Sequence, residues 1–135
     1  MGQKKERPAD RLLTGVELEL MTIIWSQGKT TVKEVVEALA KTRPLAYTSV
    51  ATVMKILEQK GYLKCEKHSH AHTFSPLVEK AAYEKSCLEH VVDNVFDGEP
   101  VALVQRLLTA KRMSADELRA IEATLQELAA TKKTA

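Results

Sequence analysis

The chain of 135 residues has only two cysteines and no long apolar run. Cys65 and Cys87 lie far apart and form no C-x-x-C pair, which argues against a disulfide scaffold or a zinc knuckle. No apolar segment approaches the roughly 20 residues that cross a bilayer. Met1–Asp10 lacks the apolar core of a signal peptide. We therefore expect a cytoplasmic protein with reduced thiols and no membrane insertion.

Motifs typical of enzymes are also missing from the sequence. It contains no Gly-rich phosphate loop, no H-E-x-x-H and no G-x-S-x-G. We therefore expect no enzymatic activity and no cofactor. The length suits one domain of ordinary size, or two small units that share a core through dimerisation.

Two helical patterns lie between residues 31 and 61. Thr31–Glu34 fits a capping box, in which each side chain accepts a hydrogen bond from the backbone N–H of the other residue, and this predicts a helix start. Pro44 disfavours helix at the residue before it and separates the two patterns. The second pattern runs from Tyr47 to Lys60, and Gly61 suits the left-handed residue at which a helix ends.

The second helical pattern has one apolar and one hydroxyl-rich side. The apolar side consists of Val50, Val53, Met54 and Leu57. The polar side consists of Thr48, Ser49, Thr52, Lys55 and Gln59. Hydroxyl groups donate or accept hydrogen bonds at base edges and phosphates, and a Thr methyl can contact a thymine methyl. The stripe predicts a helix that reads the major groove of DNA; the alternative is the ordinary solvent-exposed side of a core helix.

A short basic hairpin is predicted directly after Gly61. Tyr62–Glu66 is a strand pattern, Lys67–His70 is polar and turn-like, and Ala71–Ser75 returns as the partner strand before Pro76. A hairpin that follows a recognition helix is a wing. Its candidate DNA contacts are Lys64, Lys67, His68 and His70.

Charge is unevenly distributed along the chain. The formal net charge is +2. Residues 1–75 carry 12 Lys/Arg against 8 Asp/Glu, and residues 76–135 carry 8 against 10. The basic half therefore contains the predicted wing. An excess of four charges is modest, so we expect DNA binding to depend strongly on salt and to require two copies of the domain.

An additional helix is expected upstream. Thr14–Glu17 has capping-box spacing. An apolar stripe follows it, consisting of Leu18, Met21, Ile24 and Trp25. For Trp25, packing in the core is favoured over stacking on a base. Residues 1–11 carry several basic side chains and are expected to form a disordered arm.

The residues after Pro76 form three amphipathic helical patterns, over 78–96, over 99–109 and from the capping box Ser114–Glu117 onward. Helices this short cannot bury their apolar sides alone. Pairing with a second chain is favoured over packing on the winged helix, because helix-turn-helix proteins gain affinity by placing two recognition helices one DNA turn apart. The candidate dimerisation residues are Leu88, Val91, Val92, Leu103, Leu107, Leu118, Ile121, Leu125 and Leu128.

Several segments resemble the penicillinase repressor family: Leu12–Trp25, Val32–Val36, Tyr47–Leu57, Lys60–Leu63 and Phe74–Pro76. The resemblance implies a winged helix that binds a palindromic operator in double-stranded DNA, a helical C-terminal domain that forms a homodimer, and a gene that is switched off. It also implies that Ser49 and Thr52 meet the operator, with Thr48 and Lys55 on the same side of the helix.

The resemblance bears on induction as well. In lactam-responsive relatives a membrane sensor protease triggers cleavage of an Asn-Phe bond in the C-terminal domain; here Val95 separates Asn94 from Phe96. These three residues are the candidate cleavage site, and such a protease is a candidate partner. Copper-responsive relatives carry paired cysteines near the C-terminus. No cysteine follows Cys87, so copper sensing is disfavoured.

The wing is rich in histidine, which suggests a different function. On one continuous strand His68, His70 and His72 would share a side, and Cys65 lies close in sequence. Imidazole and thiolate ligands suit zinc, copper or nickel. A metal-responsive wing is therefore an alternative, although histidines in a surface turn are usually solvated and His72 has the alternative of packing beside Phe74.

The predicted fold class is mainly α with a small β-hairpin. We expect a disordered arm over 1–11, a winged helix-turn-helix DNA-binding domain over 12–76, a helical dimerisation domain over 77–129 and a disordered tail over 130–135. The predicted function is that of a dimeric transcriptional repressor. The alternatives are the metal-responsive regulator and a winged helix that binds another protein.

Overall fold

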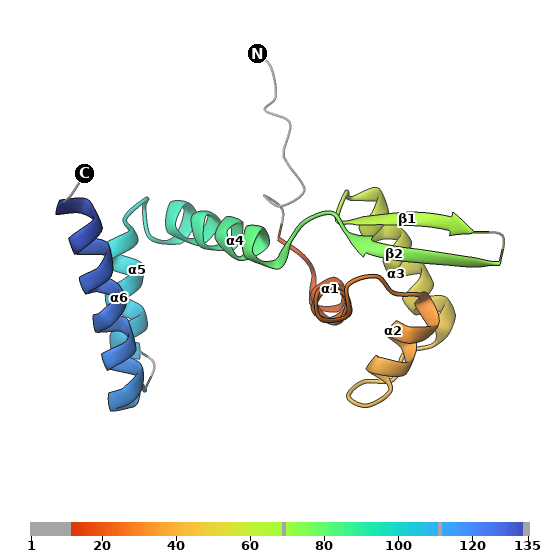
Figure 1. Ribbon diagram of the computed structural model, residues 1–135, viewed down its shortest axis with the longest axis horizontal. Helices are drawn as coiled ribbons and strands as arrows, with labels where there is room; N and C mark the ends of the chain where they lie inside the picture. Colours follow the sequence, from red (N-terminus) through yellow and green to blue (C-terminus); the bar gives the residue numbers. More distant parts are fainter. Residues whose placement is uncertain (1–11, 69, 111, 134–135) are drawn as a thin grey trace, which may run out of the picture. The chain divides into compact units, whose positions relative to one another are not determined.

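The helices begin and end where local chemistry favours it. The computed structural model describes residues 12–68, 70–110 and 112–133; the predicted basic arm over 1–11 lies outside them. Within these residues the chain forms six helices and one two-stranded hairpin (Figure 1). The elements are α1 (Gly15–Gln27), α2 (Val32–Leu39), α3 (Tyr47–Gln59), β1 (Leu63–His68), β2 (Ala71–Pro76), α4 (Lys80–Val95), α5 (Pro100–Ala110) and α6 (Ala115–Lys133).

The capping boxes are largely confirmed. At α1 the Thr14 hydroxyl accepts from the Glu17 N–H at 3.4 Å, and the Glu17 carboxylate accepts from the Thr14 N–H at 2.9 Å. The same reciprocal pair joins Ser114 and Glu117 at the start of α6. At α2 only one half of the box is present. The Thr31 hydroxyl accepts from the Glu34 N–H, but the Glu34 carboxylate accepts from the Thr31 hydroxyl and not from the Thr31 N–H. These caps fix three helix starts from local sequence.

The wing is a tight antiparallel hairpin. Cys65 pairs with Phe74, Lys67 with His72 and His68 with Ala71. Because successive side chains of a strand point to opposite sides, the pairs Cys65–Phe74 and Lys67–His72 share one side and His68 lies on the other. A further bridge joins Phe74 to Thr30, which precedes α2, and attaches the hairpin to the helices.

The hydrophobic core lies among α1, α2, α3 and the base of the hairpin. Its most deeply buried side chains include Leu20, Met21, Ile24, Val35, Val50, Met54, Leu57 and Tyr62, all with 0% exposure. The apolar stripe predicted for α1 was partly wrong. Leu18 is 38% exposed, while Leu20 and the charged Glu17 face the core.

Aromatic side chains attach the beginning of α4 to this core. The ring of Tyr83 lies 5.6 Å from that of Trp25 and 6.1 Å from that of Tyr62. Trp25 Nε1 donates to the Val78 carbonyl at 2.8 Å, and the Tyr83 hydroxyl accepts from the Leu13 N–H at 2.9 Å. Trp25 is therefore half-buried and packs against the core, in agreement with the predicted preference for core packing over base stacking.

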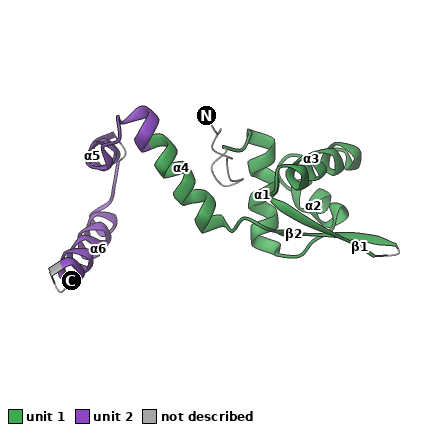
Figure 2. Cartoon of the chain, turned by 90° about the horizontal axis from the view of Figure 1, so that it is seen from above, with its two compact units in different colours: residues 1–91 green, residues 92–135 purple. Residues whose placement is uncertain are grey.

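The chain divides into two compact units, residues 1–91 and 92–135 (Figure 2). The division falls within α4, and the assignment of 77–129 to dimerisation stays a prediction. In the second unit, none of the described residues is buried. The disordered tail expected from residue 130 is corrected in part, because α6 continues to Lys133. No helix among the described residues is both long and apolar enough to cross a membrane.

Candidate nucleic-acid interface

The predicted reading side of α3 is open to solvent. Thr48, Ser49, Thr52 and Lys55 are all exposed. The opposite side is anchored by Val50, Met54 and Leu57, which have no exposed surface. Val53, predicted to be in the core, is only half-buried. The buried side fixes the rotation of the helix, so the four polar side chains lie along one accessible face.

The Thr52 hydroxyl is held by its own helix. It donates to the Thr48 carbonyl at 2.8 Å, four residues earlier. A hydroxyl has one proton and two lone pairs, so in this rotamer Thr52 presents acceptor positions and a methyl group outward. Such a side chain suits an amino group or a thymine methyl in the major groove.

The two sides of the wing carry different charges. Lys67 lies on the side that includes Cys65, and Lys64 lies on the other side with Glu66 and His68. The Glu66 carboxylate is 3.2 Å from Lys29 Nζ and 3.7 Å from His68 Nε2. The hydrogen bond from Lys29 lowers the pKa of Glu66, so this carboxylate stays charged and offsets basic charge on that side.

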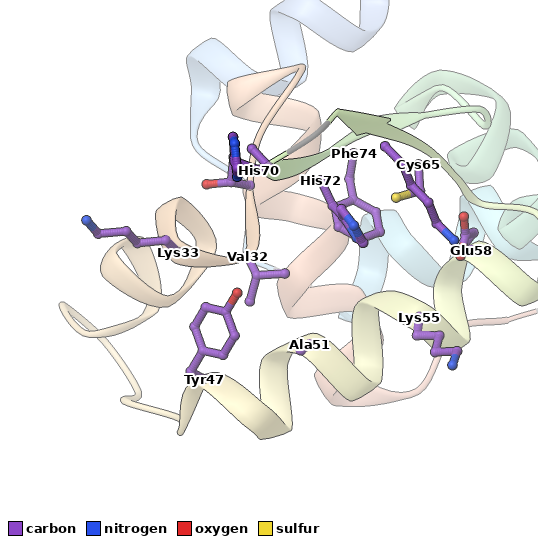
Figure 3. Close-up of a pocket in the computed structure, with 13 residues that line it drawn as sticks. Val32, Lys33, Tyr47, Ala51, Lys55, Glu58, Cys65, His70, His72 and Phe74 are labelled. Atoms are coloured by element: carbon purple, nitrogen blue, oxygen red, sulfur yellow. The ribbon is translucent and has the colours of Figure 1, made fainter.

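A groove of about 640 Å³ runs between the wing, α3 and the start of α2 (Figure 3). Its apolar surface comes from Val32, Ala51 and Phe74, and Tyr47 stands at one end. Of the predicted DNA contacts, this groove brings together Lys55, Lys67 and His70. Thr48, Ser49, Thr52, Lys64 and His68 do not line it.

Two side chains of this region were not predicted from the sequence to belong to the interface. Tyr47 is 56% exposed at the first position of α3, and Lys33 is exposed in the first turn of α2. Both line the groove. Tyr47 is the first residue of the helical pattern that follows the break at Pro44, and this position could have indicated an exposed side chain at the helix start. Nothing local to Lys33 indicated that α2 begins beside the wing.

The three wing histidines do not share one side of a strand. β1 ends at His68 and the chain turns back before Ala71, so His68 and His72 lie on opposite strands and opposite sides. No group of three His, Cys, Asp or Glu side chains among the described residues could hold a metal ion. Burial raises the pKa of the Cys65 thiol, and the nearby Glu58 carboxylate raises it further. A thiol of raised pKa is a poorer metal ligand, because thiolate is the binding form. His72 is exposed and not part of the core.

The candidate dimerisation residues remain accessible in the single chain. Leu88, Leu107, Leu118, Leu125 and Leu128 are 46% to 57% exposed. Val91, Val92, Leu103 and Ile121 are half-buried. Val95, Val101 and Val104 are also exposed, and sequence analysis did not place them among these candidates.

The candidate cleavage residues lie where α4 ends. Asn94 and Val95 are exposed in the last turn, and Phe96 follows the helix half-buried. Asp97 and Gly98 then adopt φ values of 53° and 78°. This left-handed pair ends the helix, between the helical patterns predicted over 78–96 and 99–109.

Known proteins are similar to this chain in both sequence and fold. A family model described as penicillinase repressor matches residues 13–127. The transcriptional regulator BlaI of Mycobacterium tuberculosis is 31% identical over 121 residues, covering 87% of this chain and 86% of the relative. The penicillinase repressor of Bacillus licheniformis is 23% identical over 121 residues, covering 90% and 94%.

A solved structure matches the N-terminal part. The solution structure of the DNA-binding domain of the repressor BlaI is 26% identical, with a TM-score of 0.50, covering 59% of this chain and 94% of that domain. The predicted winged helix-turn-helix is thereby confirmed. The chain belongs to the penicillinase repressor family of DNA-binding transcriptional repressors.

Proposed function

We propose that the chain represses transcription as a homodimer that binds a palindromic operator, with α3 of each copy in the major groove. The observation that carries this proposal is the exposed stripe of Thr48, Ser49, Thr52 and Lys55 on a helix that is anchored on its other side by the buried side chains of Val50, Met54 and Leu57. Similarity to the DNA-binding domain of BlaI supports DNA binding by this part of the chain. The hydroxyl groups read base edges, and Lys55 contributes charge toward phosphates.

The wing contributes contacts with the DNA backbone. Lys64, Lys67, His68 and His70 are all exposed along the hairpin. Lys67 and His70 border the groove beside α3, so a phosphate strand that passes α3 comes within reach of both. These contacts set the position of the wing on the duplex and carry little sequence information.

Dimerisation completes the reading unit. The accessible leucines of α5 and α6, and separately Leu88 of α4, supply apolar surfaces that a second copy covers. Leu118, Ile121, Leu125 and Leu128 follow the 3-4-3 spacing of a helix-pairing stripe along α6. Two linked copies bind adjacent half-sites far more tightly than one, because the second contact becomes intramolecular.

Release from DNA follows cleavage at Asn94–Phe96 by a partner protease, with a membrane sensor protease as the proposed trigger. This segment lies between the winged helix and α5, so cutting it disconnects the DNA-binding elements from α5 and α6. Each winged helix then binds its half-site alone. Loss of the intramolecular advantage weakens operator binding by about 100-fold or more.

The test is a binding measurement on a duplex selected by the purified full-length protein from a random-sequence pool. Lys55→Ala is expected to weaken binding and to reduce the slope of log affinity against log salt by about 2 for a dimer, since each protomer loses one phosphate contact. Lys85→Ala, an exposed lysine of α4, is the matched control and should leave the slope unchanged.

An unchanged slope in Lys55→Ala contradicts the proposed orientation of α3. Failure to select any duplex contradicts DNA binding itself and favours the alternative of a winged helix that grips another protein. Sedimentation of the full-length protein with the selected duplex reports the number of copies bound.

A further inference from the structure

The groove beside α3 has the make-up of a small-molecule site. Its volume of about 640 Å³ lies within the range of ligand pockets, roughly 300–1,000 Å³. Val32 and Phe74 are buried and form an apolar surface, with Ala51 of α3 opposite the hairpin. Figure 3 shows the Tyr47 ring at one end of this surface and the His72 ring above it. A flat, apolar ring matches these walls in shape and chemistry.

The charges around the groove favour an anion. Lys33, Lys55 and Lys67 contribute to its lining together with one carboxylate, that of Glu58, and Figure 3 shows the Lys33 and Lys55 side chains extending outward from the rim. Lys67 and His72 are cross-strand partners on the same side of the hairpin, so their polar groups border the same part of the groove. Figure 3 places Glu58 near Cys65, toward the end away from Tyr47. Both Glu58 and Lys67 act electrostatically on the Cys65 thiol, so the carboxylate and one ammonium group lie toward the same end, and His72 is a further hydrogen-bond donor beside Lys67.

We propose that this groove binds a small aromatic carboxylate. Its ring lies on Val32, Ala51 and Phe74 beside the Tyr47 ring. Its carboxylate accepts hydrogen bonds from Lys67 and His72. The site requires no metal and no covalent step.

Binding here has a consequence that rests on the proposed DNA-binding function. The ligand occupies the space between α3 and the wing, the two elements proposed to hold the duplex. Lys55 and Lys67 serve both the groove and the proposed phosphate contacts. The carboxylate competes with phosphates for them, and the occupied groove opposes close approach of the DNA backbone. An aromatic carboxylate is therefore a direct inducer.

Benzoate is the probe for the site, used with the full-length protein free of DNA. A ligand of one ring and one carboxylate is expected to bind with a Kd of about 1 mM, given the usual affinity per atom. Binding is followed by amide chemical shifts of 15N-labelled protein, with saturable changes expected in α3 and the hairpin. Benzyl alcohol and acetate, which lack the charge and the ring respectively, should each bind at least about tenfold more weakly.

Two variants locate the site. Lys67→Ala should weaken benzoate binding about fivefold through loss of a charge-assisted hydrogen bond. Lys64→Ala is the matched control, since it removes the same charge from the same strand on the other side of the hairpin. Ala51→Leu fills the groove and should abolish binding. Its melting curve reports folding, and Lys67→Ala decides the question if Ala51→Leu does not fold.

Absence of saturable shifts up to about 10 mM benzoate overturns the proposal, as does equal weakening by Lys64→Ala and Lys67→Ala. Competition is measured separately on the selected duplex. Benzoate should weaken DNA binding by the wild type. If benzoate binds the protein and leaves the affinity for the duplex unchanged, the inducer role is overturned while the binding site stands. If no duplex is selected, only the proposed DNA-binding function fails.

Discussion

At the scale of single residues, the buried carboxylate of Glu17 has the most direct consequence for stability. Glu17 is 5% exposed, and its Oε2 lies 2.6 Å from Lys60 Nζ at the end of α3. Burial is the largest influence on its pKa and raises it. Hydrogen bonds from Lys60 and Thr14, together with the positive charge of Lys60, outweigh burial, and the pKa falls below the usual 4.5. The pair therefore ties α1 to the last residues of the recognition helix.

This ion pair predicts a loss of stability in acid. A carboxyl whose pKa is lower in the folded chain stabilises the fold at pH values above about 4.5, and this contribution disappears as the pH falls through the lowered pKa. Glu17→Gln should lose about 1–3 kcal/mol of unfolding free energy at pH 7. The difference between wild type and variant should then narrow as the pH falls below about 4.5. Urea denaturation at several pH values measures both effects.

Glu19→Gln is the control for this prediction. Glu19 lies two positions along the same helix and pairs with Arg43 at 3.5 Å, with both side chains at least 40% exposed. Exposed pairs contribute little, so its effect should stay within about 0.5 kcal/mol. Equal losses of unfolding free energy in the two variants would show that burial of Glu17 does not strengthen its contribution to stability.

At the scale of elements, the recognition helix can be compared with α1 because both carry the same local hydrogen bond. The Thr22 hydroxyl of α1 donates to the Leu18 carbonyl at 2.8 Å, as Thr52 of α3 does to the Thr48 carbonyl. Both threonines are exposed. Their truncation therefore costs each helix a similar amount, and any difference in function comes from what the side chain meets outside the helix.

Thr52→Ala should weaken binding of the selected duplex by about 30-fold or more, because each of the two proposed copies loses one base contact that contributes at least about 1 kcal/mol. Thr22→Ala should leave the affinity unchanged. Fluorescence anisotropy of a labelled duplex measures the affinities, and thermal melts show whether the two variants lose similar stability. An equal loss of affinity in both would remove Thr52 from the interface.

Element starts and ends were predictable where one or two residues fix them. Local backbone chemistry sets the starts of α1 and α6, which Thr14 and Ser114 cap, and the end of α4 at Asp97 and Gly98. It also sets the break at Pro44. The rotation of α1 was not predictable. A charged residue is assigned to the surface by default, and the partner that allows Glu17 to be buried lies 43 positions away in sequence.

The same limit applied to the candidate site. The stripe on α3 follows from helical periodicity, and all five of its predicted side chains, including Gln59, are exposed. The groove depends on α2, α3 and the hairpin converging, which no local pattern specifies. For the histidines, a shift of one residue in the strand pairing moves side chains to the opposite side, and the sequence left the position of the turn open.

At the scale of the whole molecule, accessible leucines of α6 predict dependence on a second copy. Leu125 is 57% exposed. Leu125→Glu places a charge in the proposed interface and should weaken self-association by roughly 100-fold, or about 3 kcal/mol. Gln126→Glu adds the same charge at the neighbouring exposed position and should have little effect. Analytical ultracentrifugation over a range of concentrations distinguishes these outcomes.

A monomeric Gln126→Glu variant, or a wild type that stays monomeric at all concentrations, would contradict the assignment of this surface. The affinity for the selected duplex is an independent measure of dimerisation. If Leu125→Glu is monomeric, its operator affinity should fall by about 100-fold, because two half-sites are then bound separately.

The lone tryptophan gives the molecule a built-in optical label. Trp25 lies beside Tyr83, and its indole N–H is held by the Val78 carbonyl just before α4. Detachment of α4 from α1 exposes the indole to water and shifts its fluorescence emission to longer wavelength. Since Trp25 is the single tryptophan of the sequence, emission from the unlabelled protein reports the surroundings of this one site, where α4 meets α1. Emission spectra recorded during cleavage or ligand binding therefore show whether either event changes the packing of α4 on the winged helix.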